Sequence, residues 1–302
     1  MCSSDLGDEV GLARAWWLAS EVDNMACRWG ARAVALEHAL EHAFRADDKQ
    51  QQATLIGQLA LAIVWGPTPA DDAIARCMDF YAHAIGDRAL EAGCLTALAA
   101  LYAMRGNLDE ARESNAQARA IYDELGLKYR RAARSLIPAM VEMLAGNPAA
   151  AEAELRWGYD TLGEMGELGM RSTLAAYLAE ALYAQGRLDE TELMSKICED
   201  TAGSDDIVTQ VIWRTARSKV LARRDQFDDA ERLAREALDL ADETDFPDLR
   251  AGAAMALGEV FLLAGRFDEA EPLVKTAQEI HEQKGNIVAA RAAGSLFTAY
   301  AR

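Results

Sequence analysis

Few side chains in this 302-residue sequence are arranged for chemistry, and the histidines are the first to consider. His38 and His42 stand four residues apart, a spacing that places two imidazoles on one face of a helix, where they could bind a transition metal. The HExxH motif is absent, and the sequence places no third ligand beside the pair. We therefore interpret the pair as part of a solvated helix face, and His83 and His281, which stand alone, as structural or surface residues. No metal site and no cofactor site is predicted.

Nucleophilic and phosphate-binding arrangements are also missing. None of the four histidines stands in a catalytic motif, so no Ser–His–Asp triad can be defended. The cysteines are dispersed without CxxC spacing, a pattern typical of free buried thiols in a reducing compartment: Cys2, Cys27, Cys77, Cys94 and Cys198. A glycine series lacks the Lys-Ser/Thr and the preceding strand of a phosphate loop, so we interpret it as a flexible linker: Gly158, Gly163, Gly166 and Gly169. The sequence predicts a protein without enzymatic activity.

Two groups of basic and aromatic side chains stand out in an otherwise acidic sequence, and they are the candidate partner-binding residues. The first group is Tyr129, Arg130, Arg131 and Arg134. The second group is Gln210, Trp213, Arg214 and Arg217. Arg and Trp are enriched at the energetic centres of protein interfaces. The alternative is that these arginines form ion pairs with the acidic helix of a neighbouring structural repeat.

A recurring turn indicates the elements that position these side chains. Gly-Arg-Leu-Asp-Glu at 186–190 returns as Gly-Arg-Phe-Asp-Glu at 265–269, and Asp225 takes the glycine place in a variant. The turns fall near residues 30, 66, 106, 146, 186, 225 and 265. A period fixed at about 40 residues is the signature of a repeat array.

Each period is expected to hold two antiparallel helices. The glycine ends one helix in the left-handed conformation, and the acidic pair begins the next helix at the positive end of its dipole. The sequence thus predicts an all-α fold, a right-handed superhelical solenoid that forms one domain over residues 7–302. Because single hairpins cannot bury their apolar faces, we expect them to stack into a curved rod. Its concave wall, lined by the first helix of each pair, would be the working surface.

The expected helix boundaries follow from the turns and the apolar runs. The pairs are 7–25 with 31–45, 49–65 with 70–85, 87–105 with 109–125, 129–145 with 149–162, 171–185 with 189–201, 206–224 with 228–242, and 246–264 with 268–283. A terminal helix over about 287–301 would cover the last apolar face. Pro138 is expected to bend its helix. Residues 1–6 fit no helical pattern, and we interpret them as a non-native N-terminal scar, with the natural protein extending upstream.

Composition narrows the class of partner. A net charge of -18 argues against a phosphate-binding surface, so no nucleic acid is expected as a partner. No apolar run reaches the roughly 18 residues of a membrane helix, and no secretory signal is recognised. We therefore expect a cytoplasmic protein without membrane contact. A hydrophobic content of 51% with only 7% aromatic residues favours Ala/Leu-rich helices over β-branched strands.

The last full repeat resembles the tetratricopeptide repeat. With the turn glycine counted as position 15, small residues stand at positions 8, 20 and 27, namely Gly258, Ala270 and Ala277. In that family these positions let the two helices of a repeat approach closely. The period is longer than the standard 34 residues, which implies helices longer by about a turn. Thr191 and Cys198 replace two of the alanines in another repeat, where we expect less regular packing.

A narrower resemblance concerns the residues around three turns. The runs 65–69 (Trp-Gly-Pro-Thr-Pro), 181–187 and 220–224 are similar to those of a bacterial family of signalling proteins. In that family a class III adenylate/guanylate cyclase domain and an AAA-type ATPase precede a C-terminal array of repeats. No GxxxxGK[ST] motif and no pair of cyclase aspartates occurs here, so neither activity is assigned to this chain.

The resemblance implies a non-enzymatic protein–protein interaction or regulatory module at the C-terminus of such a protein. Its partners would be a protein or peptide, the upstream domains of its own parent protein, or a second copy. The alternative is the sensor or oligomerisation region of a transcriptional activator built from an ATPase and repeats, which would also carry a helix-turn-helix.

Overall fold

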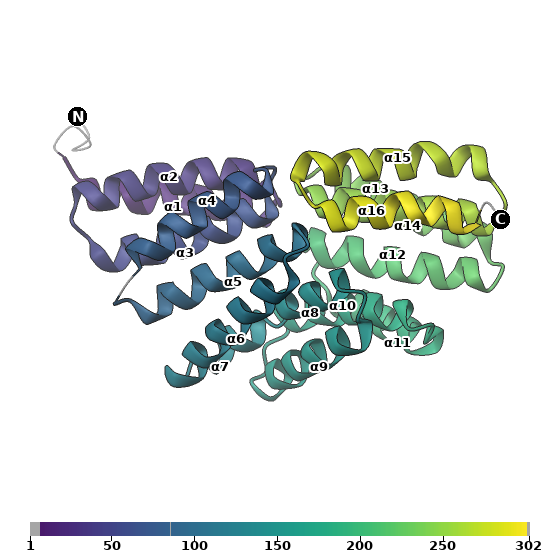
Figure 1. Ribbon diagram of the computed structural model, residues 1–302, viewed down its shortest axis with the longest axis horizontal. Coiled ribbons are helices and arrows are strands. Elements are labelled where there is room, and N and C mark those ends of the chain that lie inside the picture. Colours follow the sequence, from purple (N-terminus) through teal and green to yellow (C-terminus); the bar gives the residue numbers. More distant parts are fainter. Residues whose placement is uncertain (1–6, 85, 301–302) are drawn as a thin grey trace.

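The computed structural model describes residues 7–84 and 86–300, with only the backbone at 297–300. These residues form helices joined by turns, and no strand occurs among them. The helices are α1 (Glu9–Met25), α2 (Trp29–Arg45), α3 (Lys49–Trp65), α4 (Ala70–His83), α5 (Arg88–Met104), α6 (Leu108–Glu124), α7 (Lys128–Ala133), α8 (Leu136–Leu144), α9 (Pro148–Glu164), α10 (Gly169–Ala184), α11 (Leu188–Thr201), α12 (Ile207–Arg223), α13 (Phe227–Asp242), α14 (Pro247–Leu263), α15 (Phe267–Lys284) and α16 (Ile287–Tyr300). The predicted all-α solenoid of antiparallel helix pairs is confirmed over this part of the chain (Figure 1).

Close packing within a pair depends on the small residues of the repeat. In the pair α14–α15, Ala270 and Ala277 are fully buried. A Cβ added at Gly258 would lie 3.2 Å from the Val274 side chain, which leaves little room for any larger residue. First helices also contact first helices, as α12 does with both α10 and α14, so the pairs stack into one continuous array.

Most turns behave as the sequence predicts, but Gly66 ends α3 with an extended backbone, at φ -80° and ψ -177°. Gly106, Gly186 and Gly265 have φ angles of 79°, 73° and 73°, and Asp225 takes the same left-handed conformation at 60°. The turn predicted near residue 30 lies instead at 26–28, because α2 already begins at Trp29.

Two other predictions about backbone shape are wrong in detail. The expected bend at Pro138 is a break that separates α7 from α8. Pro138 has no N–H for the carbonyl of Arg134, and the amide of Ile137 donates to that carbonyl instead, at 2.9 Å. The glycine series is not a linker, since Gly158 lies buried inside α9. A Cβ there would lie 2.9 Å from the carbonyl oxygen of Ala132, so the glycine permits α7 and α9 to touch.

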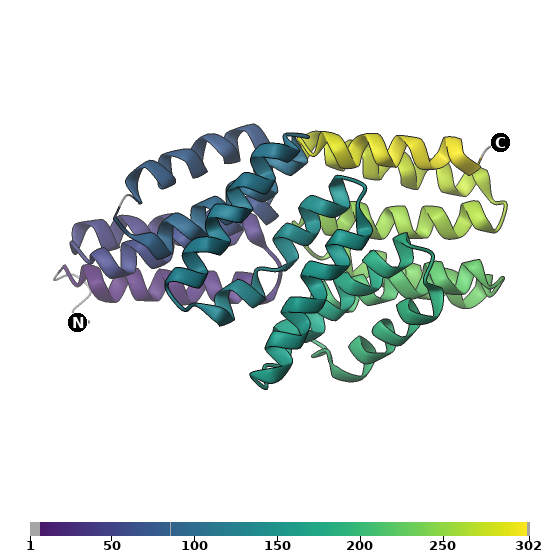
Figure 2. The same ribbon diagram turned by 60° about the horizontal axis from the view of Figure 1, so that its bottom comes forward.

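The array does not form an open rod, because its two ends meet. Figure 1 shows α1–α4 and α13–α16 side by side at the top of the molecule, joined below by the helices between them. Figure 2 shows the end of α5 beside the start of α16, where Arg105 donates to the carbonyl of Gly285 at 3.4 Å. We call this contact between the first and last helix pairs the seam. It corrects the expectation of a freely accessible concave wall.

One half of the seam completes the N-terminus of α2. Trp29 and Gly30 begin this helix, and Arg28 at its N-cap forms no side-chain cap hydrogen bond. Asp245, between α13 and α14, accepts from the amides of Trp29 and Gly30 at 2.5 and 2.8 Å. A Cβ at Gly30 would lie 3.0 Å from that carboxylate, so the glycine makes room for it. A negative charge is thus held at the positive end of a helix more than two hundred residues away in sequence.

The other half completes the C-terminus of α3. Pro67 has no N–H, so the carbonyl of Ile63 lacks its ordinary partner four residues later. Lys284, only 1% exposed at the end of α15, donates to the carbonyls of Ile63, Gly66 and Thr68 at 3.0, 2.7 and 2.7 Å. A positive charge therefore sits at the negative end of α3. We call Asp245 and Lys284 the clasp.

Candidate functional site

Two neighbouring cavities lie along the seam, walled mainly by the first helices of the pairs. The seam cavity, of about 270 Å³, is lined from the α1–α2 turn, α3, α8, α10 and α12. The inner cavity, of about 360 Å³, is lined from α8, α10, α12 and α14, and from the ends of α3, α15 and α16. Sites for small ligands and side chains in proteins have volumes of this order.

Aromatic side chains from distant repeats form the wall between the cavities. Trp65, Tyr177 and Phe246 line both cavities. Phe246 is 4% exposed and lies 5.5 Å from the Trp65 ring, between centroids, and 6.1 Å from the Trp29 ring, which it meets edge-on. Because Phe246 belongs to the seam, this wall exists only while the ends of the array are together.

The seam cavity carries negative charge. Asp205 and Asp206 line it, and neither has an ion-pair partner among the described residues. Asp206 is the N-cap of α12 and accepts from the Thr209 amide at 3.1 Å. No arginine or lysine is among the described residues that line this cavity or the inner one.

The inner cavity has apolar walls with two satisfied carboxylates. Glu180 accepts from the Thr215 hydroxyl at 2.9 Å and forms an ion pair with Lys219. Asp248 accepts from His281 and from Asn286, each at 3.0 Å. Burial raises the pKa of the Asp248 carboxyl, but the hydrogen bonds and charge of its neighbours outweigh burial and hold that pKa below its usual value.

Two hydrogen-bonding groups at the seam cavity have no partner among the described residues. The indole N–H of Trp29 is buried and unpaired. The Tyr177 hydroxyl has no partner either. Burial raises the pKa of this hydroxyl, and the negative charges of Asp248 and Asp206 raise it further. A ligand that offers a hydrogen-bond acceptor would satisfy the hydroxyl of Tyr177, which lines both cavities. The arrangement is therefore suited to binding.

The first predicted group of basic residues is only partly brought together. Arg131 and Arg134 line a cavity of about 30 Å³ beneath α7, where burial lowers the pKa of the Arg134 guanidinium. Arg131 stacks 4.1 Å from the Trp157 ring centroid and pairs with Asp123 at 2.6 Å. The remaining members, Tyr129 and Arg130, are exposed on α7.

The second predicted group forms one cluster, but it lies apart from both seam cavities. Gln210, Trp213, Arg214 and Arg217 line a depression that also includes residues of α11 and α13. Arg214 pairs with Glu236 at 3.3 Å and Arg217 with Glu199 at 2.6 Å. Arg217 thus pairs with the acidic helix of the preceding repeat, as the alternative interpretation had it, whereas Arg214 pairs within its own repeat. A partner-binding role for these residues, and for the first group, stays a prediction.

The residues examined for metal binding and nucleophilic chemistry have packing roles. His42 pairs with Glu9 of α1 at 2.6 Å, and His38 stacks on Trp16 with ring centroids 4.6 Å apart, so both contact α1 instead of solvent alone. Within residues 7–84 and 86–300, no three His, Cys, Asp or Glu side chains are grouped to hold a metal ion. Cys27, Cys77, Cys94 and Cys198 are free and buried, and burial raises the pKa of each thiol. Cys2 lies outside the described residues.

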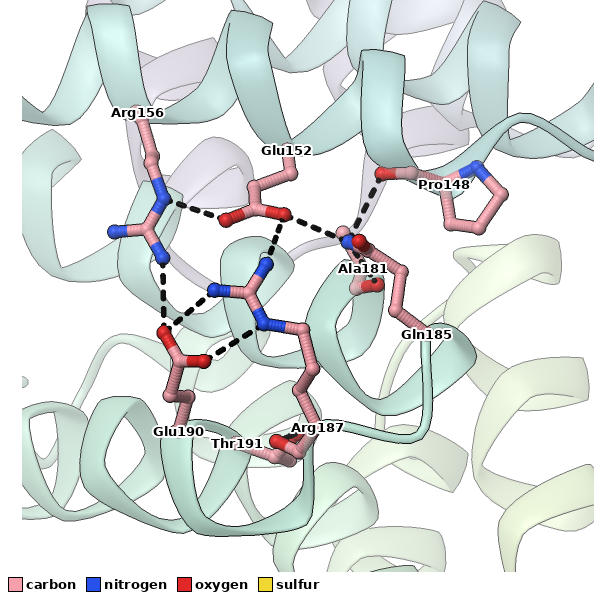
Figure 3. Close-up of polar contacts among 8 residues, drawn as sticks. All are labelled: Pro148, Glu152, Arg156, Ala181, Gln185, Arg187, Glu190 and Thr191. Atoms are coloured by element: carbon pink, nitrogen blue, oxygen red, sulfur yellow. Dashed lines mark hydrogen bonds and ion pairs between the residues drawn. The ribbon is translucent and has the colours of Figure 1, made fainter.

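The turn arginines link successive repeats (Figure 3). Arg187 donates to Glu190 at 2.6 and 2.7 Å and to Glu152 of the preceding repeat at 2.5 Å, while Arg156 donates to Glu152 at 2.7 Å. Burial raises the pKa of the Glu152 carboxyl, but these hydrogen bonds outweigh burial and lower it overall. The same ion pairs recur at Glu231, Arg235, Arg266 and Glu269. Since each carboxylate is paired, the network fixes the register of the repeats and offers no free acid or base.

A sequence signal for the cavity walls was available in the repeat register. Met140 and Glu180 each stand six residues before their turn glycine, and both line the inner cavity. The residue at the same place in the next repeat, Lys219, pairs with Glu180. The predicted residues Arg214 and Arg217 stand at other places in the register and face the second helices instead.

Comparison with known proteins agrees with this geometry. Tetratricopeptide-repeat family models match residues 92–125, 173–190 and 210–283. The fold is similar to NprR, solved in complex with its cognate peptide NprX, with a TM-score of 0.63 at 11% identity, over 96% of this chain and 83% of that one. It is also similar to a Rap protein complexed with competence and sporulation factor, with a TM-score of 0.56 at 15% identity, over 89% and 85% of the two chains. A third similar structure is the APC/C hetero-tetramer Cut9–Hcn1, with a TM-score of 0.55 at 12% identity, over 91% and 54%. No curated protein sequence is significantly similar to the chain.

The fold is a solenoid of antiparallel helix pairs similar to those of tetratricopeptide-repeat proteins, and repeats of that type are detected over part of the chain. Its particular form is an array of about 40-residue repeats whose ends are joined by a seam. Among the described helices, none is both long enough and apolar enough to cross a membrane.

Proposed function

We propose that this chain is a peptide- or protein-binding module whose binding site is formed by the seam and inner cavities. The observation that carries the proposal is the aromatic wall of Trp65, Tyr177 and Phe246, which faces open space on both sides. Large aromatic side chains dominate binding energetics when they are held rigidly around a concavity. Here the seam holds them in place.

The similar folds support the same class of ligand. NprR was solved with a cognate peptide, and the Rap protein with competence and sporulation factor. The cavities of this chain are small, so they would take a few side chains of a peptide or of an extended segment of a protein.

The test uses a glycine that opens onto the inner cavity. Gly252 of α14 lines it, and a Cβ added there would meet no atom within 4 Å. Gly252→Leu therefore fills the cavity, and it replaces a poor helix former with a good one, so the fold is retained. Gly93 of α5 is the matched control, since its Cβ would also meet nothing within 4 Å and it lines neither cavity.

Peptides selected from a random heptapeptide display library on the full chain should lose affinity for Gly252→Leu at least tenfold and bind Gly93→Leu unchanged. Selected peptides that bind both variants equally would refute the cavities as the site. A library that yields no enrichment over a chain-free surface would refute the peptide-binding function.

The parent protein is part of the same proposal. The sequence resemblance supports a cytoplasmic signalling protein in which cyclase and ATPase domains precede this module and respond to its occupancy. An upstream reading frame with those domains would agree with it, whereas an adjoining helix-turn-helix would favour the transcriptional activator instead.

A further inference from the structure

We infer that the seam cavity binds a positively charged side chain, an arginine or lysine of the partner peptide, and that Asp205 and Asp206 select it. The inference rests on the proposed function and adds the chemistry of the ligand. It follows from three properties of the cavity: its aromatic lining, its charge and the unpaired hydroxyl of Tyr177.

The aromatic lining comes first. Four aromatic side chains line the seam cavity, namely Trp29, Trp65, Tyr177 and Phe246. Cations are attracted to the faces of such rings, and cages of several aromatic residues recognise alkylammonium groups. Trp29 already holds one cation in this way outside the cavity, since the Arg32 guanidinium lies 5.3 Å from its ring centroid. Arg32 itself is paired with Glu21 at 3.1 Å and does not line the cavity.

The charge of the lining selects the sign of the ligand. Asp205 is exposed at the cavity and Asp206 is half-buried, and no cation among the described residues pairs with either. The negative charge of Asp206 also contributes to raising the pKa of Tyr177, which lines the same cavity. An anionic ligand group would be repelled here, whereas a cation would find two carboxylates that have no ion-pair partner among the described residues, at the edge of an aromatic cage.

The unpaired Tyr177 hydroxyl distinguishes a peptide from a free amine. Tyr177 lines the cavity and its hydroxyl has no partner among the described residues, so a peptide carbonyl next to a basic side chain would accept its hydrogen bond. A simple amine carries no such acceptor. We therefore assign the cation to a residue within a peptide.

The test compares capped peptides that differ in one group. The probes are acetyl-Leu-Arg-Leu-amide and the analogue in which citrulline replaces arginine, which keeps the shape and removes the charge. On the full chain, calorimetry should give at least tenfold weaker binding of the citrulline peptide, about 1.4 kcal/mol. Free agmatine should bind at least tenfold more weakly than the arginine peptide.

The carboxylates are tested by a change that keeps the helix cap. Asn caps helices as well as Asp does, so Asp205→Asn with Asp206→Asn should retain the thermal midpoint and abolish the preference for arginine over citrulline. Asp87→Asn is the matched control, because Asp87 caps α5 in the same way, accepting from Leu90 at 3.0 Å, and lines neither cavity.

Each outcome decides between the alternatives. Equal binding of the arginine and citrulline peptides, or a preference that survives the double substitution, overturns the inference and leaves peptide binding in the cavities standing. Agmatine that binds as tightly as the arginine peptide assigns the site to a small free amine. No binding of the arginine peptide to the unaltered chain overturns the inference, while the library selection tests the proposed function separately.

Discussion

The clasp makes the most direct prediction, which is that Lys284→Met opens the seam while the helices remain folded. Methionine keeps much of the volume of the side chain and removes the ammonium that bonds the carbonyls of Ile63, Gly66 and Thr68. Because Pro67 cannot supply a donor, nothing local replaces it.

The expected magnitude follows from what is left behind. Hydrogen bonds from a charged donor contribute about 1.5–3 kcal/mol each, but burial of an ammonium costs several kcal/mol, so the two terms largely cancel in the native protein. After the substitution the carbonyls are buried without a donor, at about 1–3 kcal/mol each. Opening the seam lets water reach them, so we expect the closed state to lose about 3 kcal/mol relative to the open one. That corresponds to a rise of about a hundredfold in the open population.

Hydrogen exchange reports on this opening at the other half of the clasp. The amides of Trp29 and Gly30 are bonded to Asp245 only while the seam is closed. Their exchange should accelerate by about a hundredfold in Lys284→Met, with little change at the middle of α12. Lys275→Met, on the exposed face of the same helix, is the control and should leave exchange unchanged.

Asp245→Asn should have a smaller effect of the same kind, because an amide carries no charge and has one acceptor oxygen in place of two. The double variant Asp245→Asn with Lys284→Met should be less affected than the sum of the two, since both groups hold one seam. Unchanged exchange at Trp29 and Gly30 in Lys284→Met would refute the clasp. Uniform acceleration throughout the chain would show that the seam and the fold are lost together.

Three further predictions concern packing, pH and thiol reactivity. Gly158→Ala should destabilise the protein by about 1–3 kcal/mol, because its Cβ meets the Ala132 carbonyl, whereas Gly93→Ala should be neutral or stabilising by up to about 1 kcal/mol; denaturant melts of both variants check this, and equal midpoints would contradict it. The folded-state pKa of the Asp248 carboxyl lies below its unfolded value of about 3.8, so this carboxylate stabilises the protein above that pH, and the stabilisation is lost as the pH falls through the folded-state pKa. Asp248→Asn should therefore flatten the acid side of a plot of melting temperature against pH. An unchanged plot would contradict this prediction. Burial raises the pKa of Cys27 to about 11. In a Cys2→Ser background at pH 8, Cys27 should therefore react with iodoacetamide about a hundredfold more slowly than an ordinary thiol, and opening the seam should restore the ordinary rate. Fast reaction of Cys27 in the closed protein would contradict this prediction.

The sequence predicts local features of this protein well and distant contacts poorly. The turn at 265–269 determines where one helix ends and the next begins to within a few residues, and similar turns recur along the chain. The break at Pro138 and the helix contact at Gly158 depend on what packs nearby, which the sequence pattern alone does not show. Residue type alone points to Arg214 as a contact for a partner, but its place in the repeat register faces it toward Glu236.

The seam could not be predicted for a different reason. The curvature of a solenoid is the sum of small rotations between neighbours, and no single turn determines whether the ends will meet. The local signs are visible only in retrospect: Arg28 forms no side-chain cap hydrogen bond at the start of α2, and the Trp-Gly-Pro-Thr-Pro run leaves a carbonyl without a donor.

The placement of the two clasp charges also governs how the chain tolerates shortening. In an ordinary solenoid, removing the last units subtracts their own stability and that of one interface. Here a chain cut before Asp245 would leave the α2 amides and the α3 carbonyls without their partners, at the opposite end of the sequence. Damage at one terminus would therefore be felt at the other, and removal of the last helix pairs should also weaken the first ones.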